Sequence, residues 1–318
     1  MQLLSNTDKE SQPNVTEFVL IGFSNLRELQ ILLFLLFLLF YMITLIGNIL
    51  IVLLVIADKH LHTPMYFFLG NFSGLETCYS STILPKTLAS LLTGDRSIRF
   101  HLCFVQHYFF ASFGAAECYL LSVMSYDRYL AICRPLHYAT HMNGKFCVQL
   151  VGLSFISGFL AISITIILVS RLAFCGPNEI NHFFCDVFPL IELSCSDTSL
   201  LRILIFLVAS VFTLPPFLLT LASYASIITA ILKIKSTSGR QKAFSTCSSH
   251  LIVVTIFYST IAIVYVLPNT VTLRDLNKVF SVFYAVLTPM INPLVYSLRN
   301  KEVKKALKRQ VHQLFVDT

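Results

Sequence analysis

Charged residues are scarce in this chain. Only 12% of its 318 residues are Asp, Glu, Lys or Arg, whereas 56% are hydrophobic. A water-soluble domain usually carries about 25% charged residues. Because too little charge is present to cover a surface in water, a soluble globular enzyme is excluded and a protein with several membrane spans is predicted.

The chain also lacks the features of several other classes of protein. Residues 1–28 are polar and contain no apolar core of a signal peptide before the first long hydrophobic run. We find no low-complexity tract, no internal repeat and no soluble domain. The first hydrophobic run is therefore expected to act as an uncleaved signal anchor.

Long apolar runs are what the sequence does contain. A helix needs about 20 mainly apolar residues to span a bilayer. Seven segments meet this requirement, namely 29–57, 64–92, 100–133, 146–169, 199–233, 243–267 and 277–298. The sequence therefore predicts an all-α membrane protein, a seven-transmembrane helix bundle over residues 29–298 that follows an N-terminal tail (residues 1–28).

Basic residues are unequally divided between the two sides of this bundle. Fourteen of the 23 Lys and Arg residues fall on the side that holds the C-terminus, and ten of the 16 acidic residues fall on the other side. Under the positive-inside rule the basic side faces the cytoplasm, so we expect a multi-pass plasma-membrane protein with an extracellular N-terminus. The basic excess is interpreted as topology and contact with anionic membrane lipids, in preference to nucleic-acid binding.

Residues 299–318 combine positive charge with an apolar helical pattern. Val303, Leu307, Val311 and Leu314 recur at helical spacing, with lysines between them. Such a pattern is typical of an amphipathic helix that lies on a membrane surface. We therefore predict a cytoplasmic amphipathic helix and tail over this range.

One glycosylation signal lies on the extracellular tail. Asn14 begins the sequon Asn14-Val15-Thr16 and is predicted to be glycosylated. A second sequon begins at Asn71, but it lies inside the second predicted span. That second sequon is expected to stay unused.

Glu76 and Glu117 are carboxylic acids within predicted spans. Such residues are rare in membrane helices and usually face the interior of the bundle. With Asn48 and Asn292 they are expected to form one polar cluster. Two interpretations stay open: a sodium or proton site that biases the resting state, or two protonated acids bonded to their neighbours. No other cofactor is expected.

Short motifs are spread over nearly the whole chain. They are Gly47-Asn48, LHTPMYFFL at 61–69, MSYDRYLAIC at 124–133, Ser223-Tyr224, KAFSTCSSHL at 242–251 and PMINPLVYSLRN at 289–300. By these motifs the chain resembles the rhodopsin-like G-protein-coupled receptors, and within them the odorant (olfactory) receptors. The resemblance implies a receptor and not an enzyme. Its implied partners are a small-molecule odorant and a stimulatory heterotrimeric G protein that acts through cAMP.

The resemblance also implies which residues serve G-protein coupling and activation. These are Asp127, Arg128, Tyr129, Tyr224, Asn292, Pro293 and Tyr296. Many relatives restrain the arginine with an acid on helix six, but residues 240–267 contain neither Asp nor Glu. We therefore hypothesise that Asp127 is the main partner of Arg128 at rest, with weak polar help from helix six.

Rhodopsin-like receptors bind small ligands in the outer half of the bundle. Counting from the motifs gives the expected ligand-binding residues Phe110, Ala111, Gly114, Ala115, Val208, Ala209, Phe212, Tyr258, Ile261, Ala262, Tyr265 and Val282. Plain helix packing is the alternative role for each of them. Amine-binding relatives carry Asp where this chain has Phe110, so a mainly hydrophobic, volatile odorant is predicted. For His107, a position at the membrane interface is favoured over a ligand contact.

Nine cysteines divide between the two sides, and four of them fall outside. Four cysteines allow three pairings. The resemblance implies Cys103–Cys185 and Cys175–Cys195. His182 lies three residues before Cys185, but a disulfide-bonded cysteine is a poor metal ligand, so no metal site is predicted.

Other functions compete with an odorant receptor. A non-olfactory chemoreceptor on the same scaffold would share every motif. A transporter or channel would tend to show repeated halves and interrupted helices, and we find no paired halves. An intramembrane enzyme is disfavoured because no zinc motif or serine triad accompanies Glu76 and Glu117.

Overall fold

A computed structural model describes residues 15–23, 28–175, 177–234, 236–266 and 273–316. Within its helices, the side chains of residues 239, 242–249, 266, 273–276, 296–299, 301 and 313–316 lie outside this description. Asn14 also lies outside the described residues, so its glycosylation stays a prediction.

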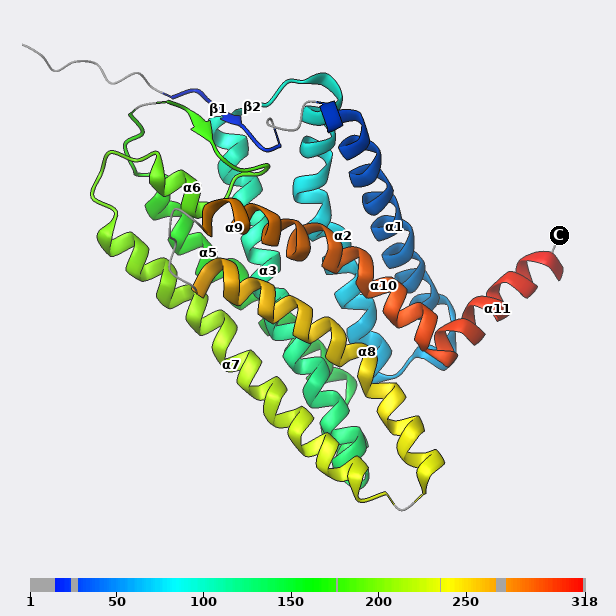
Figure 1. The fold of residues 1–318 in the computed structure, drawn as a ribbon. Coiled ribbons are helices and arrows are strands. Elements are labelled where there is room, and N and C mark those ends of the chain that lie inside the picture. Colours follow the sequence, from blue (N-terminus) through cyan, green and yellow to red (C-terminus); the bar gives the residue numbers. More distant parts are fainter. Residues whose placement is uncertain (1–14, 24–27, 176, 235, 267–272, 317–318) are drawn as a thin grey trace, which may run out of the picture.

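Seven helical rods run through the described part of the chain, at the positions of the seven predicted spans (Figure 1). The first five are α1 (Gln30–Ala57), α2 (Pro64–Thr93), α3 (Phe100–Cys133), α5 (Gly144–Val169) and α7 (Ser199–Leu232). The sixth consists of α8 (Thr237–Ile261) and the π-helical turn η3 (Ala262–Val266). The seventh consists of α9 (Leu273–Val282), the π-helical turn η4 (Phe283–Leu287) and α10 (Thr288–Arg299). The predicted helix-bundle architecture is confirmed.

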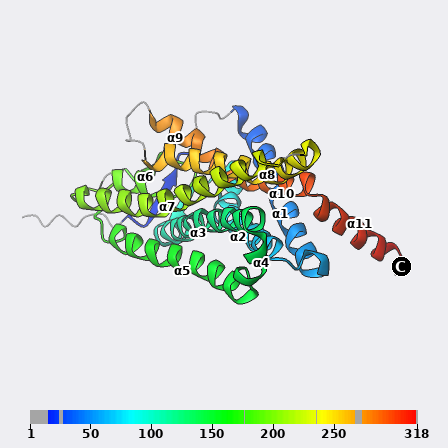
Figure 2. The ribbon, with the colours of Figure 1, turned by 90° about the horizontal axis from the view of Figure 1, so that it is seen from below.

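Shorter helices lie at the two ends of the bundle. They are η2 (Lys59–Leu61), α4 (Pro135–His141), α6 (Val187–Glu192) and α11 (Lys301–Val316). Helix α11 leaves the end of α10 sideways and projects from the bundle, as Figures 1 and 2 show. This direction suits a helix that lies along a membrane surface.

A small sheet joins the N-terminal segment to two loops at the opposite end of the bundle. Its strands are β1 (Glu17–Leu20), β2 (Ser97–Arg99) and β3 (Glu179–Ile180), in the order β2-β1-β3. Phe18 pairs antiparallel with Ile98, and Val19 pairs parallel with Glu179. Phe18 and Leu20 are buried by this pairing, so residues 17–20 are a structural part of this end and not a free tail.

Local sequence explains several helix ends. Helix α2 begins with Pro64 at its first position, where the missing N–H removes no intrahelical hydrogen bond. It ends at Gly94, whose φ of 77° lies in the left-handed region that favours glycine. Helix α5 begins after Asn143, whose side chain accepts a hydrogen bond from the Phe146 N–H at 2.9 Å.

The outer faces of the bundle are apolar. Among the described residues, four helical segments are long and apolar enough to cross a membrane by themselves: Gln30–Ala57, Gly144–Val169, Ser199–Leu232 and Asn277–Val295. Large hydrophobic side chains of α1, α5 and α7 are exposed on them, such as Ile31, Ile156 and Leu218. An apolar exposed surface of this extent indicates contact with lipid.

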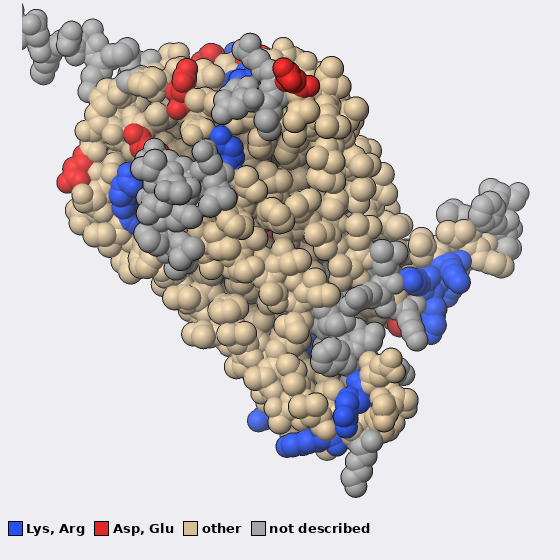
Figure 3. Space-filling model, in the orientation of Figure 1, with Lys and Arg blue, Asp and Glu red and all other residues tan. Residues whose placement is uncertain are grey.

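Charged side chains lie mostly at the two ends of the molecule. Figure 3 shows a broad band with almost no charge on the visible face. Acidic side chains gather, with some basic ones, at the end that holds β1, whereas the opposite end and α11 carry mainly Lys and Arg. This distribution is the one that the positive-inside rule requires of a bundle with its C-terminus in the cytoplasm.

Helix α3 occupies the centre of the bundle, where it contacts α2, α5, α7 and α8 (Figure 2). Its contact with α5 depends on Gly158. A Cβ atom at position 158 would lie 2.8 Å from the backbone oxygen of Ser112 and 3.1 Å from the backbone nitrogen of Ala116. Because both are backbone atoms of α3, a larger residue would push the two helices apart.

Gly158→Ala should therefore destabilise the bundle by about 1–3 kcal/mol, the usual cost of overpacking. The measurement is the midpoint of thermal unfolding of the purified protein in lipid nanodiscs. Gly152→Ala is the matched control, because a Cβ atom at position 152 of the same helix meets no atom within 4 Å. Equal midpoints for the two variants would contradict the role given to Gly158.

Candidate functional site

A cavity lies between the helices in the half of the bundle that holds the sheet. It encloses about 760 Å³ of space, including its open side. Its wall consists of Tyr79, His107, Phe110, Ala111, Gly114, Ala115, Cys118, Ile162, Thr165, Val187, Ile205, Val208, Ala209, Phe212, Thr213, Ile261, Tyr265 and Tyr284.

Helix α3 supplies one side of this cavity with one large and several small residues. The ring of Phe110 stacks on Tyr79 at a centroid distance of 4.6 Å and packs against Phe184 at 4.7 Å. One turn further, Gly114 and Ala115 leave open space. A Cβ atom at position 114 would meet only the Tyr79 ring, at an ordinary contact distance of 3.6 Å. The volume of the cavity therefore depends on the small side chains of α3.

Nine of the twelve expected ligand-binding residues lie in this wall. Tyr258, Ala262 and Val282 do not line it. The Tyr258 hydroxyl donates a hydrogen bond to the backbone oxygen of Cys118 at 2.6 Å, so this side chain lies against helix α3 next to the cavity. Val282 packs instead against the hydrophobic core, and Ala262 lies in the π-helical turn η3. A direct role for these three in binding stays a prediction.

The wall contains nine residues that the expected set does not include: Tyr79, His107, Cys118, Ile162, Thr165, Val187, Ile205, Thr213 and Tyr284. Helical spacing could have identified two of them, because His107 and Cys118 lie one turn from Phe110 and Gly114 on the same face of α3. Tyr79 comes from α2 and Ile162 comes from α5. No local sequence pattern indicates that these two helices contribute to the wall.

A group of polar side chains closes the outer end of the cavity. The Tyr265 hydroxyl donates to the Asp186 carboxylate at 3.3 Å and lies 3.0 Å from the Tyr284 hydroxyl. His107 is buried and not interfacial, and its Nδ1 lies 3.8 Å from Asp186 Oδ1. Nδ1 has no hydrogen-bond partner among the described residues, so it can bond to a ligand.

Asp186 itself belongs to the loop above the cavity. Its Oδ1 accepts a hydrogen bond from the Val187 N–H at 2.8 Å. Asp186 is the N-cap residue of the short helix α6. Burial raises the pKa of the Asp186 carboxyl to about 6, although the hydrogen bonds from Val187 and Tyr265 lower it. The Asp186 carboxyl therefore gains or loses its proton near pH 6, slightly below neutral pH.

Two disulfides fix this loop. Cys103 of α3 is bonded to Cys185, and Cys175 is bonded to Cys195, as the resemblance implies. The first bond holds residues 182–187 over the end of α3. Among the described residues no group of three or more His, Cys, Asp or Glu side chains is arranged to hold a metal ion.

The four polar residues expected at the centre of the bundle lie together. Asn292 Nδ2 donates to Glu76 Oε1, and Asn48 Nδ2 donates to the Pro289 oxygen at 3.2 Å. The carboxyl groups of Glu76 and Glu117 interact directly. Both oxygens of Glu117 and one oxygen each of Glu76, Asn48 and Asn292 are buried with no hydrogen-bond partner in the described structure. Carboxylate and amide oxygens of this kind are the ligands that hard cations prefer.

At the end of the bundle that holds α4, Asp127 and Arg128 form no ion pair within 4 Å. Asp127 Oδ1 instead accepts a hydrogen bond from the Tyr138 hydroxyl at 2.8 Å, and no ion pair between Asp127 and Arg128 exists in this part of the structure. Burial and the neighbouring Asp127 raise the pKa of Tyr138, so its hydroxyl keeps the proton that it donates. The charge of Arg128 still attracts Asp127 over a longer distance, so Asp127 as the main partner of Arg128 at rest stays a prediction.

Helix six does provide a polar contact at this end of the bundle, but its partner is Tyr224 and not Arg128. The Tyr224 hydroxyl of α7 lies 2.6 Å from His250 Nδ1 of α8, and both side chains are buried. Tyr129 packs on the same small cluster. Asn292 and Pro293 lie within α10, while the side chain of Tyr296 falls outside the described residues.

Helix α11 is fixed to the loop between α1 and α2. Arg309 donates from Nη2 and Nε to Asp58 Oδ2 at 2.7 and 2.9 Å. Burial raises the pKa of Asp58, but the hydrogen bonds from His60 and Arg309 outweigh it and hold the value at about 2. Asp58 is therefore ionised at neutral pH and holds α11 against the end of α1.

The pKa of Asp186 gives a pH-dependent stability. The folded-state pKa of about 6 lies above the unfolded value of about 3.9. The native state is therefore favoured below pH 4 and loses that advantage as pH rises through 6. Asp186→Asn should remove this loss, so its melting midpoint should rise relative to wild type between pH 5 and pH 7.5.

The comparison is made in lipid nanodiscs by thermal unfolding at both pH values. Glu179→Gln is the control, because it removes an exposed carboxylate from the same loop. Parallel pH dependence of wild type and Asp186→Asn would refute the assignment.

Known proteins resemble this chain over nearly its whole length. A family model described as olfactory receptor matches residues 37–314. Human olfactory receptor 5B21 is 49% identical over 306 residues, which cover 96% of this chain and 99% of that protein. Mouse olfactory receptor 5AP2 is 49% identical over 302 residues, 95% of each chain. This chain therefore belongs to the olfactory receptor family.

Proposed function

We propose that this receptor binds small, mainly hydrophobic, volatile odorants in the cavity between α3, α5, α7 and η3. As a member of its family it is an odorant receptor coupled to a G protein, and not an enzyme. The observation that supports the proposed site is the cavity wall, which is apolar over most of its area. Such a wall favours ligands that gain more from burial than from hydrogen bonds.

The polar groups of the wall narrow the ligand class. His107 Nδ1, free of a partner in the described region, can bond to one oxygen of an alcohol, aldehyde or ketone. Phe110 occupies the place where a carboxylate would hold an amine, and Asp186 is not part of the wall. A neutral odorant with one or two polar groups therefore fits better than a cation.

We propose further that the resting state is held by two contacts at the opposite end of the bundle. These are the hydrogen bonds of Tyr138 with Asp127 and of Tyr224 with His250. An odorant that binds better to the active state shifts the equilibrium away from these contacts. Arg128, which is only partly buried, then becomes accessible to the partner. The partner is a stimulatory heterotrimeric G protein, and the signal is cAMP.

The charge distribution supports the orientation that this function needs. The end with Arg128, α4 and α11 carries mainly basic residues and faces the cytoplasm, where anionic lipids lie. The end with the sheet and the two disulfides faces outward across the plasma membrane, in an oxidising environment. The odorant and the G protein thus bind at opposite ends of the same helix bundle.

We also propose that a sodium ion binds between Glu76 and Glu117. Two buried carboxylates side by side need a cation or a proton to offset their charges. Asn48 and Asn292 supply two further side-chain oxygens, which accept no hydrogen bond from any described residue. A proton shared by the two acids would leave these two oxygens without a hydrogen bond. The ion would stabilise the resting arrangement of α2, α3 and α10.

Gly114→Val should reduce potency in a way that depends on odorant size. The added methyl groups would fill space beside Tyr79, so the largest agonists should lose at least about tenfold in potency and the smallest much less. The measurement is a cAMP concentration–response series for one set of homologous odorants at equal surface expression. Gly74→Val is the control, since a Cβ atom at position 74 meets nothing within 4 Å. A uniform loss for all sizes, or the same loss in the control, would contradict the proposed cavity.

Sodium should raise the thermal stability of the wild-type receptor relative to choline at equal ionic strength. Glu117→Ala should abolish this difference because it removes two of the buried oxygens. The measurement is the melting midpoint in nanodiscs at matched sodium, potassium and choline chloride concentrations. Equal midpoints in all three salts would show that the acids share a proton instead of an ion.

A further inference from the structure

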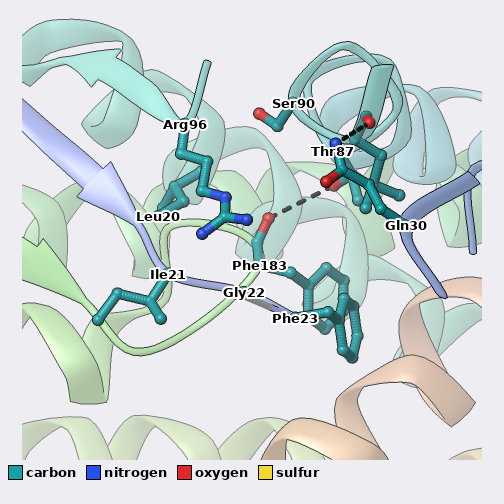
Figure 4. A pocket seen from close by; sticks show the side chains of 10 residues that line it. Leu20, Ile21, Gly22, Phe23, Gln30, Thr87, Ser90, Arg96 and Phe183 are labelled. Atoms are coloured by element: carbon teal, nitrogen blue, oxygen red, sulfur yellow. Dashed lines mark hydrogen bonds between the residues drawn. The ribbon is translucent and has the colours of Figure 1, made fainter. Parts of the chain in front are cut away.

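A second, smaller pocket lies beside the N-terminal segment, away from the odorant cavity. It encloses about 450 Å³ of space, including its open side, and shares no lining residue with the odorant cavity. Figure 4 shows its wall, which is formed by Leu20, Ile21, Gly22, Phe23, Gln30, Thr87, Ser90, Leu91, Arg96 and Phe183. Strand β1, helix α2 and the disulfide-bonded loop thus meet around this pocket.

Arg96 brings a positive charge to this pocket. Its backbone oxygen accepts a hydrogen bond from the Leu20 N–H at 3.0 Å, which fixes the residue next to β1. Its side chain is partly buried and makes no hydrogen bond or ion pair with any described residue. The adjacent carboxylate of Asp95 is exposed and accepts from the Ser97 N–H instead. Figure 4 shows the guanidinium group beside the N-terminal segment.

A hydroxyl donor in the same pocket also lacks an acceptor. Ser90 Oγ is buried and has no hydrogen-bond partner in the described structure. The other polar side chains are already bonded: Thr87 donates within α2 to the Ile83 oxygen at 3.1 Å, and Gln30 donates to the Leu91 oxygen at 2.6 Å. The pocket therefore offers one guanidinium and one hydroxyl to an acceptor that the described part of the chain does not provide.

The rest of the pocket is apolar. The rings of Phe23 and Phe183 stack at a centroid distance of 5.4 Å, and Leu20, Ile21 and Leu91 complete this side. Lys278 adds positive potential nearby, since its Nζ donates to the Gly22 oxygen at 3.1 Å. A ligand that suits both halves carries one negative group and a short hydrocarbon part.

We propose that this pocket is a second, extracellular binding site for a small organic anion, a monocarboxylate with a short apolar chain. The carboxylate accepts hydrogen bonds from the guanidinium of Arg96 and the hydroxyl of Ser90. The chain lies against Phe23 and Phe183. A multivalent inorganic anion fits less well, because it would need more cations and would leave the apolar side in contact with water.

Sodium hexanoate is the probe, and 1-hexanol is the neutral probe of equal chain length. The melting midpoint of the purified full-length receptor in nanodiscs is measured against the concentration of each. Hexanoate should raise the wild-type midpoint with saturation, because it binds the folded state. Hexanol belongs to the class proposed for the odorant cavity, so any effect that it has should be the same in wild type and in Arg96→Gln. No stabilisation by hexanoate would overturn the proposal.

Arg96→Gln should raise the hexanoate concentration needed for half-maximal stabilisation by roughly tenfold or more, as expected for loss of a charged partner. Arg96→Lys should give an intermediate value, because it keeps the charge and loses the fork of donors. Arg99→Gln is the matched control, since Arg99 is an exposed arginine of the same loop outside the pocket. Unchanged hexanoate binding in Arg96→Gln would place the ligand in another cavity and refute the site. This readout needs neither odorant nor G protein, so it can fail or succeed independently of the proposed odorant site.

Discussion

The hydrocarbon interior of the membrane offers no hydrogen-bond partners, and the rest of this structure depends on that constraint. Each backbone N–H and C=O in a span must bond within its own helix. Side chains that face lipid are apolar, as on α1, α5 and α7, so polar side chains are confined to the interior of the bundle. The buried group of Asn48, Glu76, Glu117 and Asn292 is the result. Because position 158 is a glycine, α5 approaches α3 closely and the interior of the bundle is small.

The outer end of the bundle is organised by the loop around Cys185. The bond to Cys103 holds this loop on α3, and β1 pairs with the preceding part of the same loop. Phe183 faces the pocket of Arg96, whereas Val187 faces the odorant cavity. One short segment thus separates two spaces with different chemistry: one is mainly apolar, and the other contains an arginine that has no partner among the described residues.

Helix six carries no acidic residue at the end of the bundle that holds α4, so no salt bridge can join it to Arg128 there. Two hydrogen bonds between neutral or singly charged partners replace a salt bridge: Tyr138 bonds to Asp127, and Tyr224 bonds to His250. Such bonds are each worth about 0.5–1.5 kcal/mol, and up to about 3 kcal/mol where a charge takes part.

The sequence by itself determined the helices and the family, because hydrophobic length and the short motifs are local properties. Counting from the motifs of the resembling family also identified the α3 side of the cavity, where Phe110, Ala111 and Gly114 lie. Only the tertiary structure decided which residues of α2, α5 and the outer loop meet that side, that residues 17–20 form a strand, and that Asp127 bonds to Tyr138 and not to Arg128. These contacts join segments far apart in the chain or depend on side-chain direction, and neither is encoded in a local periodicity.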